Sequence, residues 1–149
     1  MNQELQVRIP VIGAWKLISF ETQKENGEVI YPFGNNVQGS LIYTKSGSMS
    51  VHLMRYDRPQ FASGDQMKGT TEEIKANYEG VISYYGSYGF DREKGLVIHN
   101  IQGSLFPNWE GQRQERFFEL SGNRLKLGTP PTLWGGGKAV AVMLWERIE

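Results

Sequence analysis

The chain has 149 residues, with 16 Lys and Arg against 16 Asp and Glu, and no Cys. Balanced charge without a run of either sign argues against a nucleic acid or an anionic membrane as partner. The absence of cysteine excludes disulfides and zinc sites built on thiolates. A chain of this length can bury one core, so we expect an arm over residues 1–12 and a single domain over residues 13–149.

The sequence pattern also disfavours a metal site, a signal peptide and a membrane helix. The two histidines, His52 and His99, lie far apart and without a ligand-type spacing, so we expect no metal site. The first ten residues lack the apolar run of a signal peptide, and no segment approaches the roughly 20 apolar residues of a membrane helix. We therefore expect a cytoplasmic protein.

The first half of the chain alternates between short apolar segments and tight turns. With 18 Gly, seven Tyr, seven Phe and four Trp, this pattern favours an antiparallel all-β protein. The turn residues Asn26 and Gly27 predict a first hairpin, because both accept a positive φ. The expected strands are residues 13–22, 29–31, 39–44 and 48–54.

A loop over residues 55–69 then precedes the one predicted helix. Thr70 can cap its first turn while Glu73 bonds back, which is the pattern of a capping box. Ile74, Tyr78 and then Val81 or Ile82 follow at helical spacing and give one apolar stripe. We expect this helix to plug or flank the sheet.

The second half returns to strands, which we expect over residues 84–91, 96–104, 113–120, 124–127 and 139–147. A loop over residues 129–137 ends in three glycines. The total is about eight to ten strands, which is the size of a small closed antiparallel β-barrel able to hold one ligand. The predicted fold is thus all-β, a barrel with one short α-helix and no need for a cofactor.

Two ionisable residues lie on strand faces that are otherwise apolar. His99 shares a face with Val97 and Ile101, and Arg116 shares one with Phe118, because alternate side chains of a strand point to the same side. Buried ionisable groups are costly unless paired, so these two positions suggest a polar spot in an apolar cavity. They are the predicted catalytic residues.

Each has a structural alternative. His99 is either a general acid or base or a core histidine whose nitrogens are satisfied by Asn100, a tyrosine or water. Arg116 either holds a carboxylate or developing oxyanion or forms a salt bridge with a glutamate, for which Glu115, Glu119 and Glu146 are the candidates.

Aromatic and polar residues near the predicted strand ends are candidates for substrate binding. Trp109 stands in a turn, where a large aromatic either covers the core or lines an entrance. Trp134 precedes the three glycines at residues 135–137. It either belongs to a mobile flap or covers the end of the barrel. The tyrosines either supply hydroxyls to a pocket or are ordinary strand aromatics. Arg55 and Arg58 either reach the mouth of the barrel or lie in a solvated loop. The predicted binding residues are Trp109, Tyr43, His52, Arg55, Tyr84, Tyr88, Phe118 and Trp134.

The ordered motifs resemble a known family. They are Gly13-x-Trp15-x-Leu17, Tyr31-Pro32-x-Gly34, Gly39-x-Leu41-Ile42-Tyr43, Arg55-x-x-Arg58-Pro59, Pro107-Asn108-Trp109-x-Gly111 and, at the end, Trp145-Glu146-Arg147. The set is similar to the lipocalin-like domain family, whose barrels are of the calycin type. The resemblance implies a hydrophobic cavity open at one end, and an early Trp packed on a late Arg, here Trp15 and Arg147. Related small barrels include natural-product cyclases and isomerases, one of them in the scytonemin pigment pathway.

These observations lead to one main prediction and two alternatives. The main prediction is a cofactor-independent cyclase or lyase of secondary metabolism, acting on a hydrophobic aromatic intermediate by orientation and exclusion of water. The first alternative is a binding or carrier protein for a small hydrophobic molecule. The second is an interaction protein whose barrel is packed solid. A homodimer is compatible with each.

Overall fold

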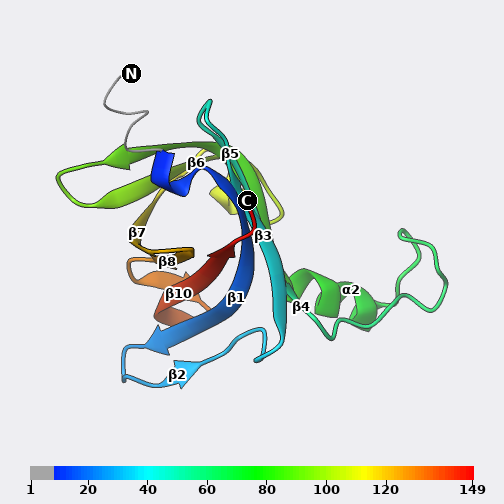
Figure 1. Cartoon of the computed structure of the whole chain (residues 1–149). Helices are drawn as coiled ribbons and strands as arrows, with labels where there is room; N and C mark the ends of the chain where they lie inside the picture. The colour runs from blue at the N-terminus through cyan, green and yellow to red at the C-terminus, as the bar shows by residue number, and fades with distance from the viewer. Residues whose placement is uncertain (1–8) are drawn as a thin grey trace.

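The computed structural model describes residues 9–149 and shows a closed antiparallel barrel (Figure 1). Eight long strands form the wall: β1 (Gly13–Lys24), β3 (Val37–Tyr43), β4 (Ser48–Arg55), β5 (Val81–Asp91), β6 (Leu96–Ser104), β7 (Arg113–Ser121), β8 (Arg124–Gly128) and β10 (Gly137–Arg147). Two short strands, β2 (Val29–Ile30) and β9 (Thr132–Trp134), extend the sheet beside β1 and β10. The predicted all-β barrel is confirmed.

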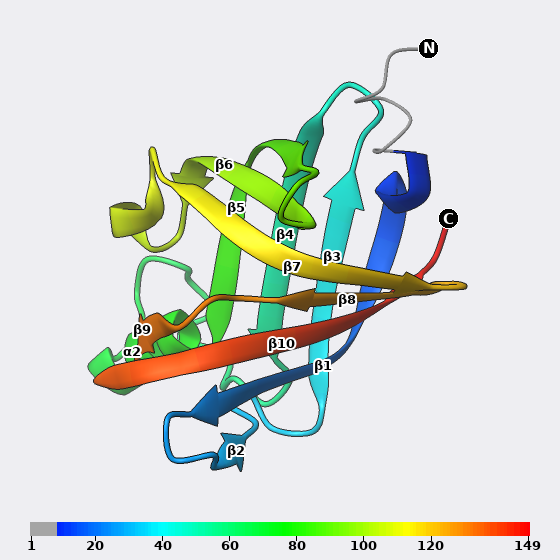
Figure 2. The same cartoon turned by 90° about the vertical axis from the view of Figure 1, so that its left-hand side faces the viewer.

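The wall strands follow the order β1-β3-β4-β5-β6-β7-β8-β10, and antiparallel pairing of β1 with β10 closes the sheet. All other pairs of neighbouring strands in this order are antiparallel as well. Strands β7, β8 and β10 cross in front of β3, β4 and β5 at a steep angle, as Figure 2 shows. Closure removes the exposed sheet edges that would otherwise pair with other chains.

The core is made by alternate residues of the wall strands. In β4, Met49, Val51 and Leu53 are buried, whereas Ser50 and His52 between them are only partly covered. This alternation is what a sheet with one buried face requires.

A β-bulge interrupts the alternation in β1. The pairing of β1 with β10 shifts between Leu17 and Ser19. The residues buried in β1 are consequently Trp15 and Leu17 before the bulge and Phe20 and Thr22 after it. A bulge adds one residue and so reverses which positions face inward.

One end of the barrel is sealed by the beginning and the end of the chain. The Arg147 guanidinium lies 4.2 Å from the centre of the Trp15 ring, as expected for a structural cation–π pair. Arg147 also donates to the carbonyls of Ile12 and Pro10, at 2.7 and 2.6 Å. Trp15 Nε1 donates to the Val11 carbonyl at 2.9 Å. Residues 1–8 of the predicted arm lie outside the described residues, and Ile9–Val11 form a single 3₁₀ turn, η1.

The helix α2 (Thr71–Glu79) begins as predicted, because Thr70 accepts from the Glu73 amide and Glu73 bonds back to the Thr70 amide. Its predicted length is wrong. The helix ends at Glu79, and Val81 and Ile82 belong to β5 instead. In the described chain, no helix combines the length and hydropathy needed to span a membrane.

The helix flanks the barrel and does not plug it. No residue of α2 is buried, and Ile74 and Tyr78 on its apolar stripe are exposed. In Figure 1 the helix and the loop before it project sideways from the barrel, next to the end of β4. The helix therefore contributes no buried side chain to the interior of the barrel.

Candidate functional site

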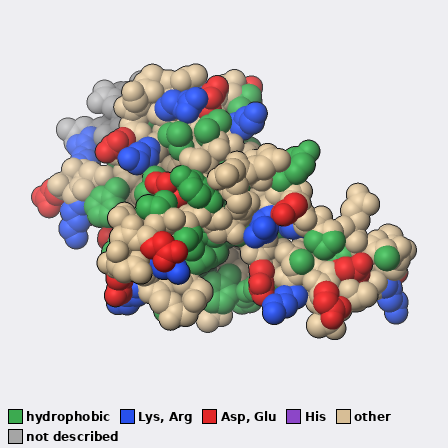
Figure 3. Space-filling view, turned by 90° about the horizontal axis from the view of Figure 1, so that it is seen from below, with side chains coloured by type: hydrophobic (Ala, Val, Ile, Leu, Met, Phe, Trp, Pro, Cys, Tyr) green, Lys and Arg blue, Asp and Glu red, His purple; other side chains and the backbone are tan. Residues whose placement is uncertain are grey.

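The barrel end opposite the Trp15 and Arg147 pair opens into a groove beside α2. The groove has a volume of about 760 Å³ and is bounded by the segment after β4, by α2, by the turn after β6 and by β9. Seen from this end, hydrophobic side chains gather in the hollow and charged side chains surround them (Figure 3). Leu133, Leu105 and Phe106, which line the groove, are exposed. An apolar depression with a charged rim is typical of a binding site.

A second, inner cavity of about 70 Å³ lies within the barrel. Trp109, Trp134 and Ile82 line both the groove and this cavity, so they form the boundary between the two. The Trp134 ring packs edge-on against Phe20, with centroids 6.2 Å apart. The Trp109 ring packs perpendicular to Tyr84, at 6.0 Å. The predicted alternative of a barrel packed solid is wrong, because the barrel holds a cavity.

His99 and Arg116 both line the inner cavity, although they come from different strands. In the pairing of β6 with β7, Val97 lies opposite Arg116 and His99 lies opposite Gln114. The two predicted catalytic residues are thus diagonal neighbours, a relation that places Cα atoms about 7–8 Å apart.

His99 is 1% exposed, and both of its ring nitrogens have tyrosine partners. Nε2 lies 2.6 Å from Tyr43 Oη, and Nδ1 lies 2.8 Å from Tyr84 Oη. Burial, followed by the positive charge of Arg116, lowers the pKa of His99 well below its usual value. The ring is therefore neutral near pH 7, and it presents no unoccupied nitrogen to the cavity.

Arg116 is 8% exposed and makes no ion pair within the described part of the chain. Its Nη1 donates to the Glu115 carbonyl at 2.8 Å and its Nη2 to Gln114 Oε1 at 2.6 Å. The glutamates considered as partners are otherwise engaged or exposed: Glu115 pairs with Arg113 and Glu146 with Arg124. The alternative of a salt bridge between Arg116 and one of these glutamates is therefore wrong, and the Arg116 charge borders the cavity without a counter-ion among the described residues.

Two more polar atoms on the cavity wall lack a partner. Thr22 Oγ1 and Trp145 Nε1 are buried without a hydrogen bond among the described residues, and both residues line the inner cavity. An unpaired buried donor costs about 1–3 kcal/mol. Both atoms therefore carry this cost in the structure, beside the cavity that their residues line.

Four of the predicted binding residues do not line either the groove or the inner cavity. Tyr43 lies behind His99, and the Tyr88 ring packs at a tilt against that of Tyr43, with centroids 4.6 Å apart, while its hydroxyl donates to the Thr44 carbonyl. Phe118 packs against Phe90 at 5.6 Å.

His52 lies on the outer face of β4, since it alternates with buried neighbours, and its Nδ1 bonds Ser83 Oγ at 2.7 Å. The sequence alone leaves the strand face of His52 ambiguous. For Tyr43, Tyr88 and Phe118, the alternation along a strand predicts that the side chain points inward. It does not predict at which height along the barrel axis the side chain lies.

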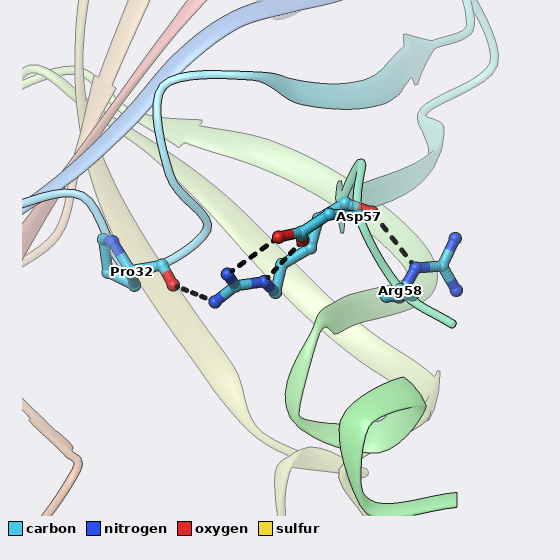
Figure 4. A network of polar contacts seen from close by, with 4 residues as sticks. Pro32, Asp57 and Arg58 are labelled. Carbon is cyan, nitrogen blue, oxygen red and sulfur yellow. Dashed lines mark hydrogen bonds and ion pairs between the residues drawn. The ribbon is translucent and has the colours of Figure 1, made fainter. Parts of the chain in front are cut away.

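Arg55 lies on the wall of the outer groove, with Arg58 next to it. Its guanidinium donates to the Pro32 carbonyl and to the Asp57 carboxylate, each at 3.0 Å. Figure 4 shows Pro32, Asp57 and Arg58 around this network. Arg58 Nε in turn donates to the Arg55 carbonyl at 3.1 Å. These contacts hold the segment after β4 in place, and the Arg55 charge is already balanced by Asp57.

Most of the residues that line the cavity were not predicted, and those with polar groups among them include Gln114, Thr22 and Trp145. Gln114 could have been found, because it is two residues from Arg116 on the same strand face. Thr22 could not, because the bulge in β1 reverses the inward positions. Within residues 9–149, no group of three or more His, Cys, Asp or Glu is placed to hold a metal ion.

The comparisons with known proteins agree with this architecture. A family model described as "lipocalin-like domain" matches residues 12–148. The chain belongs to this family.

One relative is the 4'-hydroxy-3'-methoxypropiophenone carrier protein ppsC of Aspergillus oryzae (strain ATCC 42149 / RIB 40). It is 28% identical over 107 residues, which are 67% of this chain and 96% of the relative. No solved structure matches this chain significantly. The resemblance to the family is confirmed, and the relative is named as a carrier rather than as a cyclase.

Proposed function

We propose that this protein binds and carries a small aromatic molecule in its barrel. The single observation that supports this most is the inner cavity: an apolar chamber with an uncompensated guanidinium, Arg116, and two unpartnered polar atoms on its wall. Ligand sites are mostly apolar and carry a few well-placed polar groups. The name of the relative supports an aryl ketone as the ligand class.

The size of the two spaces supports a ligand that extends across their boundary. The inner cavity of about 70 Å³ is small for a substituted benzene, whereas the groove of about 760 Å³ is ample. Entry requires Trp134 or Trp109 to rotate. Gly135 and Gly136, which follow Trp134, both have positive φ values, and glycine permits this conformation without strain. The aromatic ring would lie between these tryptophans, with a polar group directed inward.

A calorimetric titration tests the proposal. The probe is 4'-hydroxy-3'-methoxypropiophenone, and the control is decan-2-one, an aliphatic ketone with the same number of carbon atoms. We expect a dissociation constant on the order of micromolar for the aromatic ketone and at least tenfold weaker binding of the aliphatic one. Equal affinities would contradict an aromatic site, and no binding of either ketone would contradict the carrier function.

A cofactor-independent cyclase or lyase is the second candidate. The observation that favours it is the position of Arg116, where a cation could stabilise an enolate formed from a bound ketone. Against it, neither nitrogen of His99 is unoccupied, so the imidazole could act on a substrate only through Tyr84. Chromatography of the ligand after incubation separates the two: a carrier returns it unchanged, whereas an enzyme converts it and loses turnover, but not binding, on His99→Gln.

A further inference from the structure

We infer that the inner cavity takes its ligand as an anion, through an ionised phenol or enol oxygen held by Arg116 and by the Tyr84 hydroxyl. This inference rests on the proposed function and specifies the ligand class further. It predicts selection of aromatic molecules whose hydroxyl is made acidic by a conjugated carbonyl. The proton of the hydroxyl is released to the solvent on binding.

The charges around the cavity support an anion. The lining residues with ionisable side chains are Arg116 from β7, His99 from β6 and Tyr84 from β5, whereas β1, β4, β8 and β10 contribute none. Among residues 9–149, no Asp or Glu lines the cavity. Because His99 is neutral, the wall carries one positive charge, and the Arg116 guanidinium donates to two neutral oxygens, the Glu115 carbonyl and Gln114 Oε1. A buried cation without a counter-ion is unfavourable, and a ligand anion would remove this cost.

The tyrosines next to His99 indicate which hydroxyl is available. Tyr43 is fully buried and lies off the cavity, and His99 Nε2 is the partner of its hydroxyl among the described contacts. A buried hydroxyl needs an acceptor for its proton, so Tyr43 donates to Nε2. The imidazole proton then resides on Nδ1 and is donated to Tyr84 Oη.

Tyr84 therefore keeps its own hydroxyl proton for another acceptor, and Tyr84 lines the cavity. The donor from Tyr84 and the N–H groups of Arg116 face the same chamber, which offers few free acceptors because Gln114 Oε1 is already bonded to Arg116. A wall of donors favours an oxygen that only accepts, and an ionised phenol oxygen meets this condition better than a hydroxyl.

The experiment uses two probes, 4'-hydroxyacetophenone and its methyl ether 4'-methoxyacetophenone, which cannot ionise. The phenolate absorbs at longer wavelength than the phenol, so a pH titration of absorbance with excess protein gives the pKa of the bound probe. We expect this pKa to be one to three units below that of the free phenol, as for a charge next to an opposite charge, and we expect tighter binding of the phenol than of the ether.

Each outcome decides the inference. If both probes bind but the phenol keeps its solution pKa, the inference fails and the proposed carrier function stands. If neither probe binds, both fail. The measurement on the wild-type protein needs no variant, so it remains decisive even where a substituted protein does not fold.

Two variants then assign the effect to its source. Arg116→Gln is expected to abolish the pKa shift and to weaken binding of the phenol at least tenfold, while affinity for the ether changes less. Arg113→Gln is the matched control, because it removes the same charge from the outer face of the same strand. A shift lost in Arg113→Gln, or kept in Arg116→Gln, would overturn the role of Arg116.

Discussion

The neutral, buried state of His99 makes the stability of the protein depend on pH in a defined window. The perturbation is acidification from roughly pH 7 to pH 5. The unfolded state takes up a proton at the ordinary histidine pKa of 6.5, whereas the folded state resists it because burial and Arg116 lower the pKa of His99. The unfolded state then binds more protons, so stability falls as the pH falls below 6.5.

The magnitude follows from protonation of the unfolded state alone. Between pH 7 and pH 5 the loss in the free energy of unfolding is about 2 kcal/mol, with a limiting slope of about 1.4 kcal/mol per pH unit. The lowered pKa values of Asp57 and Glu73 act in a different window. Their contribution is present above the ordinary carboxyl pKa and is lost only at lower pH, through their folded-state values.

Urea unfolding followed by circular dichroism at several pH values measures this dependence. The wild type and His52→Gln should lose about 2 kcal/mol over the window, because His52 is the other histidine and lies outside the core. His99→Gln should be less stable at neutral pH by about 1–3 kcal/mol, since a tyrosine hydroxyl loses its partner, but it should lose much less on acidification. Equal slopes for all three proteins would refute the reasoning.

Three further predictions concern the cavity wall and the helix. Thr22→Val should raise the free energy of unfolding by about 1 kcal/mol, because Thr22 Oγ1 has no hydrogen-bond partner among the described residues. Thr129→Val should lower it by a similar amount, because Thr129 Oγ1 accepts from the Ala141 amide. Chemical denaturation of the two variants measures both changes. Trp134→Ala should speed ligand association and weaken affinity in stopped-flow measurements, and slower association would contradict the boundary role of Trp134. Thr70→Ala should accelerate amide exchange in α2, while the melting temperature stays nearly unchanged because no residue of α2 is buried.

The fold could be predicted from the sequence because the barrel depends on local signals. Alternating apolar residues predict which strand face is buried, and glycine turns predict where strands end. Local signals also make the predicted helix too long. Val81 and Ile82 continue its apolar spacing, but in the structure they pair with Met54 and Leu53 of β4 and belong to β5. Tertiary pairing overrides a short helical pattern.

The site could be predicted only in part. His99 and Arg116 stand out in the sequence because an ionisable residue on an apolar face is unusual, and pairing of their strands brings both to one cavity, while their catalytic role stays a prediction. Tyr43 illustrates what alternation leaves out, since it points inward but lies behind His99. Thr22 illustrates a second limit, since a one-residue bulge turned it inward and no residue pattern announces that bulge.

The central claim is that the ring of an aromatic ligand lies between Trp109 and Trp134 with its polar group in the inner cavity, and the indole signals of the four tryptophans test it directly. Trp109, Trp134 and Trp145 line the cavity, whereas Trp15 lies at the sealed end with its Nε1 bonded to Val11. In a ¹H–¹⁵N correlation spectrum titrated with 4'-hydroxy-3'-methoxypropiophenone, the first three indole signals should shift together, with that of the unpartnered Trp145 Nε1 among them, and the Trp15 signal should remain in place. A titration that leaves Trp145 unmoved, or that shifts Trp15 instead, would contradict the account.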